Sequence, residues 1–269
     1  MKGAKLVLSL IAACSVAGAA FAGDIVINGS TTVLPIAQAA AEKFMAANGG
    51  VKITVSGGGS GNGIKALIDG TTDIADSSRF IKNEEVAAAV ANKIYPVPFA
   101  VAVDALIPVV HPSNPVNLLT TEQLRKIYKG EIKNWKDVGG EDKQIAVVGR
   151  DTSSGTYETW EEKIMKKERV TERALIVASN GAMAQTVAKN KLAIGYIGIG
   201  YLNDTLKPVA VDGIGGTAKT ALDGTYPVAR YLYMFTKGWP TGDVLSFVNF
   251  VLSDQGQKIV SESGFVPLR

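Results

Sequence analysis

The 269-residue sequence has few of the residues that carry most enzymatic and metal chemistry. It holds one cysteine, Cys14, and one histidine, His111. If residues 1–22 are removed, as their own pattern indicates, no cysteine remains for a disulfide, a thiolate nucleophile or a thiolate-bound metal. His111 precedes Pro112 after an apolar run, a position typical of a turn residue. The sequence therefore counts against hydrolysis, which needs a base beside a serine or a cluster of metal ligands.

An excess of charge of one sign is also missing. The chain carries 28 basic and 25 acidic residues, for a formal net charge of +3. Without Lys2 and Lys5, 26 basic residues face 25 acidic ones. This balance is too even for a protein that binds nucleic acid or an anionic membrane through a general positive field. We expect no nucleic-acid partner, and any selectivity for anions must come from local geometry.

The N-terminal segment has the pattern of a secretory signal peptide. Lys2 and Lys5 precede an apolar stretch from Leu6 to Ala19, and Ala20-Phe21-Ala22 matches an A-x-A cleavage signal. The stretch is shorter than the about 20 residues of a membrane-spanning helix. An alternative stays open, because Ile11-Ala-Ala-Cys14 resembles a bacterial lipobox in which Cys14 would be lipidated and kept. Cleavage after Ala22 and export of the rest are favoured.

From residue 24 on, strand and helix patterns alternate. Alternation of this kind predicts a parallel, doubly wound sheet with ligand loops at the carboxyl ends of its strands. Strands are expected at 24–28, 51–56, 72–78, 94–99, 144–148, 192–196 and 230–235, with a near-continuous apolar run at 101–110. Helices are expected at 34–47, 62–68, 83–90, 120–128, 154–167, 181–189, 241–252 and 254–261, and residues 203–227 are expected to be irregular.

Three loops rich in glycine and hydroxyl side chains each lead into an expected helix, at 28–32, 56–63 and 150–156. The first N–H groups of a helix are unpaired and carry partial positive charge, so they favour anions. Glycine lets the backbone approach a small ligand, and Arg150 adds a planar fork of donors. The three loops together indicate a site for one small tetrahedral oxyanion. Loops so far apart in sequence are easiest to bring to one ion from two lobes around a cleft.

At these loops the chain resembles the periplasmic phosphate-binding proteins of ABC importers, which are two-lobed substrate-binding proteins. The motifs are Gly29-Ser-Thr-Thr32 with Pro35, Gly59-Ser-Gly-Asn-Gly-Ile-Lys65, Asp73-Ile-Ala-Asp-Ser-Ser-Arg79, Ile127-Tyr-Lys-Gly-Glu-Ile-Lys-Asn-Trp135, Arg150 to Thr156, and Ala193-Ile-Gly-Tyr196. The resemblance implies an α/β fold of type II, in which each lobe is a central β-sheet flanked by helices. We expect lobe one to hold residues 24–99 and 230–269, and lobe two to hold residues 100–229.

The resemblance also implies the ligand-binding residues. They are Thr31, Thr32, Ser60, Ser78, Arg79, Arg150, Ser153, Ser154, Gly155 and Thr156. Two departures concern selectivity. Many relatives have an aspartate at the position of Ser78, where it accepts the proton of phosphate, and an acid at the position of Thr152. The acceptor here is left open among Ser78, Asp76 and Asp151.

The expected function is that of a receptor. The chain would bind inorganic phosphate in the cell envelope, in the periplasm, and deliver it to the membrane permease of an ABC importer. We expect a monomer that is not an enzyme and that uses no metal and no cofactor. Two alternatives stay open: a receptor for another oxyanion such as sulfate or molybdate, and a secreted serine hydrolase or phosphatase built on Ser154.

Overall fold

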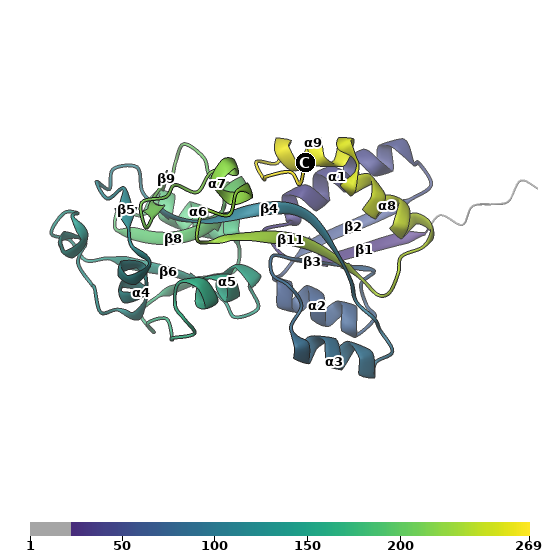
Figure 1. Ribbon diagram of the computed structural model, residues 1–269, viewed down its shortest axis with the longest axis horizontal. Coiled ribbons are helices and arrows are strands. Elements are labelled where there is room, and N and C mark those ends of the chain that lie inside the picture. Colours follow the sequence, from purple (N-terminus) through teal and green to yellow (C-terminus); the bar gives the residue numbers. More distant parts are fainter. Residues whose placement is uncertain (1–22) are drawn as a thin grey trace, which may run out of the picture.

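The computed structural model describes residues 23–269 (Figure 1), so the expected signal peptide and Cys14 lie outside the described residues. The strands are β1 (Asp24–Gly29), β2 (Lys52–Gly57), β3 (Ile74–Ser77), β4 (Val97–Val110), β5 (Leu118–Leu119), β6 (Ala146–Arg150), β7 (Leu175–Val177), β8 (Ala193–Gly198), β9 (Lys207–Pro208), β10 (Ala210–Val211) and β11 (Ala229–Thr236). The helices are α1 (Leu34–Ala47), α2 (Ser60–Ile68), α3 (Asn83–Ala91), α4 (Thr121–Lys129), α5 (Gly155–Lys163), α6 (Asn180–Lys189), α7 (Ala218–Leu222), α8 (Gly242–Leu252) and α9 (Asp254–Glu262), with short 3₁₀ turns at Trp135–Val138 and Ile199–Tyr201.

One mixed sheet runs through the molecule in the order β2-β1-β3-β11-β4-β8-β6-β7, with β9 added to β4. The outer pairs β1–β2, β1–β3, β6–β7 and β6–β8 are parallel, as the alternating pattern predicts. The prediction of a wholly parallel sheet is wrong at the centre, where β11 runs antiparallel to β3 and β4, and β4 runs antiparallel to β8. The two long strands β4 and β11 connect the two halves of the molecule (Figure 1).

The expected strand at 94–99 and the apolar run at 101–110 form one strand, β4. Its first part packs in a core with α1 and α8, which includes Ala102. Its second part, from Val103 on, packs in a separate core with Tyr128, Trp160 and other residues. Both faces are covered along the second part, and for this reason its sequence, apart from Asp104, is apolar without alternation. β4 therefore leaves one core and enters the other between Ala102 and Val103, a few residues beyond the boundary expected at residue 100.

The described hydrophobic cores agree with two lobes, and the expected bounds of the lobes stay a prediction. The last residues of the chain reach both cores, since Phe265 packs in the first and Val266 in the second. Residues 203–227 are more regular than expected. They contain β9, β10 and the five-residue α7, whose start is capped by Thr217 and Thr220. Within residues 23–269 no helix is long and apolar enough to cross a membrane.

The fold brings the three polar loops to one place. The loops that follow β1, β2 and β3 leave the carboxyl ends of parallel strands in lobe one. The loop that follows β6 leaves its strand in lobe two and leads into α5. Hydrogen bonds between residues 30–32 or 58–61 and residues 153–180 join these loops across the two lobes.

Candidate functional site

The loop after β1 presents two buried threonines to lobe two. The Ser30 N–H donates to the Asp76 carbonyl oxygen (2.8 Å), and the Ser30 hydroxyl accepts from the Thr32 N–H (3.1 Å). These bonds fix the backbone as it enters α1. The side-chain Nδ2 of Asn180 donates to the hydroxyl oxygens of Thr31 (3.2 Å) and Thr32 (3.0 Å). The first loop is therefore tied to the start of α6 in the other lobe.

Ser60 and Ser78 lie together opposite the start of α5. The Ser78 N–H donates to the Ser60 hydroxyl (3.0 Å), and the two hydroxyl oxygens are 3.3 Å apart. A Cβ atom on Gly155 would lie 2.4 Å from the Ser60 hydroxyl oxygen and 2.7 Å from that of Ser78. Only glycine allows the N-terminus of α5 to approach the two serines this closely. The Gly61 N–H also donates to the carbonyl oxygen of Ser153 across the lobes (2.9 Å).

Arg150 ends β6 as a buried, rigidly held cation. Its Nε donates to the Val177 carbonyl oxygen and its Nη2 to the Ala178 carbonyl oxygen, both at 3.0 Å. Its Nη1 is buried and has no hydrogen-bond partner among residues 23–269. Burial lowers the pKa of Arg150 and nearby Arg230 lowers it further, while Asp151 opposes both effects. A guanidinium nonetheless stays ionised, so the site contains a fixed positive charge with one uncommitted donor.

The serines of the third loop have local partners. The Ser154 hydroxyl accepts from the Tyr157 N–H (3.2 Å) and so caps α5. The Ser153 hydroxyl donates to the Asp151 carboxylate and, at 3.4 Å, to the Gly58 carbonyl oxygen of lobe one. Thr156 continues the site, because its hydroxyl lies 2.9 Å from that of Thr32.

Arg230, which sequence reasoning missed, lies between the two lobes. Its Nε donates to Asp104 Oδ2 (2.8 Å), and the two residues face each other in the β11–β4 register. Its Nη2 reaches the hydroxyl oxygens of Thr156 (3.1 Å) and Thr32 (3.4 Å). Asp104 is fully buried and also accepts from the Ile199 N–H (2.9 Å). The pair thus places a second cation beside the polar loops.

A signal for this pair was present in the sequence. Asp104 interrupts an otherwise apolar run and Arg230 opens a strand, and buried charges are rare unless they are paired. Asn180 directly precedes the helix expected at 181–189, where its residue type suits an N-cap. The structure gives that role to Ser179 and places Asn180 in the first turn of α6, fully buried, where its side-chain oxygen accepts from the Gly198 N–H (3.2 Å).

Asp76 is a second buried acid beside the polar loops, and it lacks the ion-pair partner that Asp104 has. It lies at the end of β3, opposite Gly29 of β1 and two residues after Ile74, so it faces the side of the sheet that α1 covers. Both carboxylate oxygens are buried and without a hydrogen-bond partner among residues 23–269. Burial raises the pKa of Asp76 well above its usual range. A carboxyl group in this state is suited to accept or share a proton. Asp151 is partly exposed and already bonded to Ser153.

Arg79 needs a correction. The resemblance implied that it contacts the ligand, but its guanidinium is directed at two glutamates. Nη1 and Nη2 lie 2.8 and 2.6 Å from the Glu85 carboxylate, and Nε lies 2.6 Å from Glu158 Oε2. A guanidinium held on three sides in this way is not available to a small ligand. Among the expected residues, Arg79 is therefore the one that we leave out of the proposed ligand set.

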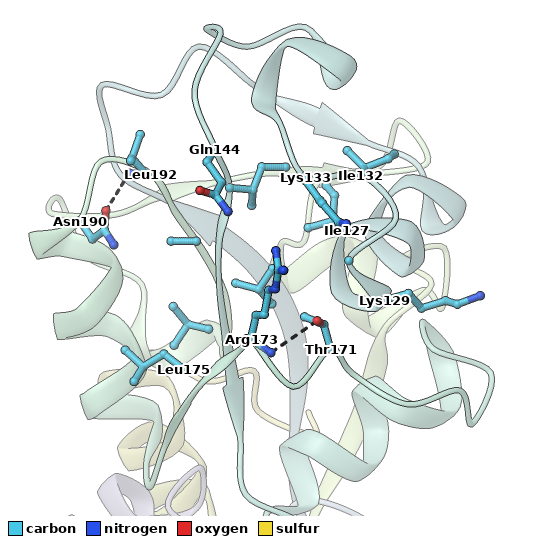
Figure 2. Close-up of a pocket in the computed structure, with 15 residues that line it drawn as sticks. Ile127, Lys129, Ile132, Lys133, Gln144, Thr171, Arg173, Leu175, Asn190 and Leu192 are labelled. Carbon is cyan, nitrogen blue, oxygen red and sulfur yellow. Dashed lines mark hydrogen bonds between the residues drawn. The ribbon is translucent and has the colours of Figure 1, made fainter.

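A cavity of about 640 Å³ lies elsewhere in lobe two, between α4 and the edge formed by β6 and β7. Figure 2 shows the Arg173 side chain extending into it near Gln144. None of the expected ligand residues lines this cavity. Residues 23–269 also contain no group of three acidic, histidine or cysteine side chains placed to hold a metal ion.

Comparisons with known proteins show the family of the chain. A family model described as the PBP superfamily domain matches residues 15–255. The chain belongs to this superfamily. It is 34% identical over 248 residues to the phosphate-binding protein PstS of Bacillus subtilis, and this match covers 91% of this chain and 81% of that protein. It is 32% identical to the PstS of Borreliella burgdorferi over 90% of this chain and 89% of that one.

A solved structure from Clostridium perfringens, described as a phosphate ABC transporter substrate-binding protein with bound phosphate, superposes on this member of the superfamily with a TM-score of 0.86. The two are 34% identical, and the match covers 92% of this chain and all of that one. The two-lobed periplasmic binding protein fold predicted from the sequence is confirmed.

Proposed function

We propose that this protein binds inorganic phosphate between its two lobes and delivers it to the permease of an ABC importer. The observation that carries the proposal is the buried pairing of donors and one acceptor where the lobes meet. Arg150 offers an uncommitted N–H, and the buried residues Thr31, Thr32, Ser60 and Ser78 offer hydroxyls. Asp76 offers a carboxylate without a partner among residues 23–269. Phosphate is negatively charged and keeps a proton near neutral pH. A site for it therefore needs hydrogen-bond donors for the oxygens and an acceptor for the proton.

The names of the relatives support the same function, since the Bacillus and Borreliella proteins are named for phosphate binding. Export fits the secretory pattern of residues 1–22 and a receptor that works outside the membrane. We further propose that the mature protein works as a monomer in the periplasm. Hinge opening about β4 and β11 would let phosphate enter and leave, and closure would enclose it.

Two other functions were left open by the sequence. Asp76 disfavours a receptor for sulfate or molybdate. An anion without a proton has no hydrogen bond to donate to the Asp76 carboxylate and is repelled by its charge. A serine hydrolase built on Ser154 is disfavoured because that hydroxyl caps α5. His111, the single histidine, is instead bonded to Ser113 at 2.8 Å. Absence of turnover of a chromogenic phosphate ester would agree with a receptor, and measurable turnover would favour the hydrolase.

Calorimetric titration of phosphate-depleted protein with phosphate, arsenate, sulfate and molybdate tests the proposal. We expect one site that prefers phosphate and arsenate, with sulfate at least roughly tenfold weaker because one buried polar partner stays unpaired at a cost of about 1–3 kcal/mol. A preference for sulfate or molybdate would assign the protein to another oxyanion, and heat signals from none of the four would contradict oxyanion binding altogether.

The lobes should approach one another when phosphate binds. Because the ligand loops come from both lobes, an ion between them draws the lobes together while β4 and β11 act as the hinge. Small-angle X-ray scattering should show a modest decrease in the radius of gyration at saturating phosphate, and none with added chloride at the same ionic strength. Identical profiles with and without phosphate would indicate a rigid site.

Replacing Thr32 by valine should weaken phosphate binding by roughly 5- to 30-fold, which corresponds to the loss of about 1–2 kcal/mol of hydrogen bonding. Valine keeps the shape of threonine but removes the hydroxyl that contacts Thr156, Asn180 and Arg230. The matched control is Thr71→Val in the same lobe, whose hydroxyl bonds only the Ala66 carbonyl oxygen. Calorimetry should find the control unchanged. Equal affinities for both variants would remove Thr32 from the ligand set.

A further inference from the structure

Four charged side chains form a cluster at the rim of the contact between the lobes. Arg79, Lys82 and Glu85 belong to lobe one, and Glu158 on α5 is the single member from lobe two. Glu158 Oε2 lies 2.6 Å from Arg79 Nε and 2.8 Å from Lys82 Nζ. The Arg79 contact is an ion pair and not a linear hydrogen bond, because the N–H does not point directly at the oxygen. We call these four residues the rim cluster.

The rim cluster is buried enough for its charges to interact strongly. The side chains of Arg79 and Glu158 are only 9% and 12% exposed, whereas Lys82 is 44% exposed. Salt and water screen partly buried pairs less than exposed ones. Two cations act on one carboxylate, so the Glu158 charge is fully compensated only while the lobes are in contact.

Arg79 keeps a partner on lobe one without lobe two, whereas the Lys82 ammonium has Glu158 as its one ion-pair partner among residues 23–269. Glu85 accepts from Nη1 and Nη2 of Arg79 and also from the backbone N–H of Lys82 (2.9 Å). This arrangement keeps Arg79 oriented toward the position that Glu158 occupies. Within the rim cluster, separation of the lobes would therefore break only the two contacts of Glu158, and closure would reform them without rearranging Arg79.

The rim cluster is directly connected to the anion site. Arg79 follows Ser78 in sequence, and Glu158 lies two residues after Thr156 in the first turn of α5. Ser78 and Thr156 are both buried at the meeting of the lobes. A movement of α5 that separates Gly155 from Ser60 and Ser78 must also separate Glu158 from Arg79 and Lys82.

We propose that Arg79 and Lys82, by binding Glu158, form a latch that holds the lobes closed and sets how tightly phosphate is retained. The inference rests on the proposed phosphate-binding function. In it Arg79 and Glu158 are positioning residues that do not touch the ligand. They act on the equilibrium between separated and closed lobes, and any stabilisation of the closed state increases the apparent affinity for an ion enclosed there.

The test compares Glu158→Gln with Glu161→Gln on the same helix. Glu161 accepts a hydrogen bond from the Tyr157 hydroxyl (3.0 Å) and has no ion pair across the lobes. We expect Glu158→Gln to weaken phosphate binding roughly 5- to 20-fold, the range for loss of a partly buried charge-assisted contact. Glu161→Gln should stay within about twofold of wild type. Lys82→Gln, at a more exposed position, should weaken binding less, and combined with Glu158→Gln it should add little further loss.

A readout that does not depend on affinity separates a latch from a general structural effect. Residues 23–269 contain no cysteine, so spin labels can be attached at Ala88→Cys on α3 and Lys163→Cys on α5, both exposed. At a phosphate concentration that half saturates the wild type, Glu158→Gln should shift the distance distribution toward longer values, and Glu161→Gln should not. Saturating phosphate should restore the short distance in both.

The outcomes are distinct. Wild-type affinity and wild-type distances in Glu158→Gln would overturn the latch alone, provided that the wild type binds phosphate. A wild type that does not bind phosphate would overturn the proposed function and the latch with it. If Glu158→Gln does not fold, Lys82→Gln decides, and an unchanged affinity in that variant would contradict the latch.

Discussion

Replacing Arg150 by alanine should weaken phosphate binding by roughly 30- to 1,000-fold, equivalent to about 2–4 kcal/mol, while leaving the protein folded. The Arg150 guanidinium is held by the carbonyl oxygens of Val177 and Ala178. Its Nη1 is buried and lacks a partner among residues 23–269. A donor fixed in this way loses little entropy when it binds an anion, so its removal costs nearly the whole contact.

Two controls isolate the role of Arg150. Arg125→Ala removes the same charge from lobe two, but at a surface position paired with Glu122 and Glu168. It should leave the affinity unchanged. Arg150→Lys keeps the charge and loses the planar fork, and it should fall between wild type and Arg150→Ala. Titration calorimetry gives the affinities and urea unfolding checks the fold. Equal affinities of wild type and Arg150→Ala would remove Arg150 from the ligand set.

Replacing Asp76 by asparagine should weaken phosphate binding about 10- to 100-fold and bring the affinity for sulfate closer to the affinity for phosphate. A carboxylate can accept the proton that phosphate keeps near neutral pH, and hydrogen bonds to charged groups contribute about 1.5–3 kcal/mol. The amide removes the charge that repels sulfate. Asp151→Asn is the control, because Asp151 is partly exposed and bonded to Ser153. If both variants exclude sulfate as the wild type does, neither aspartate is the acceptor.

Asp76 also predicts how stability depends on pH in the absence of phosphate. Burial raises its pKa in the folded protein, with no opposing partner. A raised folded pKa means that the folded state binds the proton more tightly than the unfolded chain, whose aspartate titrates near about 4. The free energy of unfolding should therefore fall as the pH rises from about 4 through the raised pKa. Asp76→Asn should be more stable than wild type at pH 8 and close to it near pH 4.

Urea unfolding of both proteins at the two pH values measures this effect. Added phosphate should reduce the difference in unfolding free energy between wild type and Asp76→Asn at pH 8, because a bound ion gives the carboxylate a partner. An unchanged difference between the proteins from pH 4 to pH 8 would show that Asp76 does not titrate in this range.

The positions of the three polar loops could be predicted because each depends on local chemistry. Helix α1 occupies the predicted residues, since Pro35 suits the first turn and the apolar residues repeat with helical spacing. The glycine and hydroxyl clusters mark the places where strands end and helices begin. Arg150 stands beside such a cluster, and the N–H donors of its guanidinium make it recognisable as a candidate anion contact.

The residues that were missed depend on contacts between distant parts of the chain. Arg230 and Asp104 are 126 residues apart in sequence and meet only because β11 pairs with β4. The resemblance implied that Arg79 contacts the ligand, but the direction of its guanidinium is set by Glu85 and Glu158, one of which lies in the other lobe. β7 contains only three residues, too few for a pattern to appear.

The central claim is that one tetrahedral oxyanion is enclosed where the two lobes meet. A crystal structure of the protein with arsenate, which resembles phosphate and scatters anomalously at the arsenic edge, locates the ion directly. The account predicts one strong anomalous peak within hydrogen-bond distance of Arg150 Nη1 and the hydroxyls of Thr32 and Ser60, with the Asp76 carboxylate beside it. A peak in the lobe-two cavity beside Arg173, or at the rim beside Arg79, would contradict it.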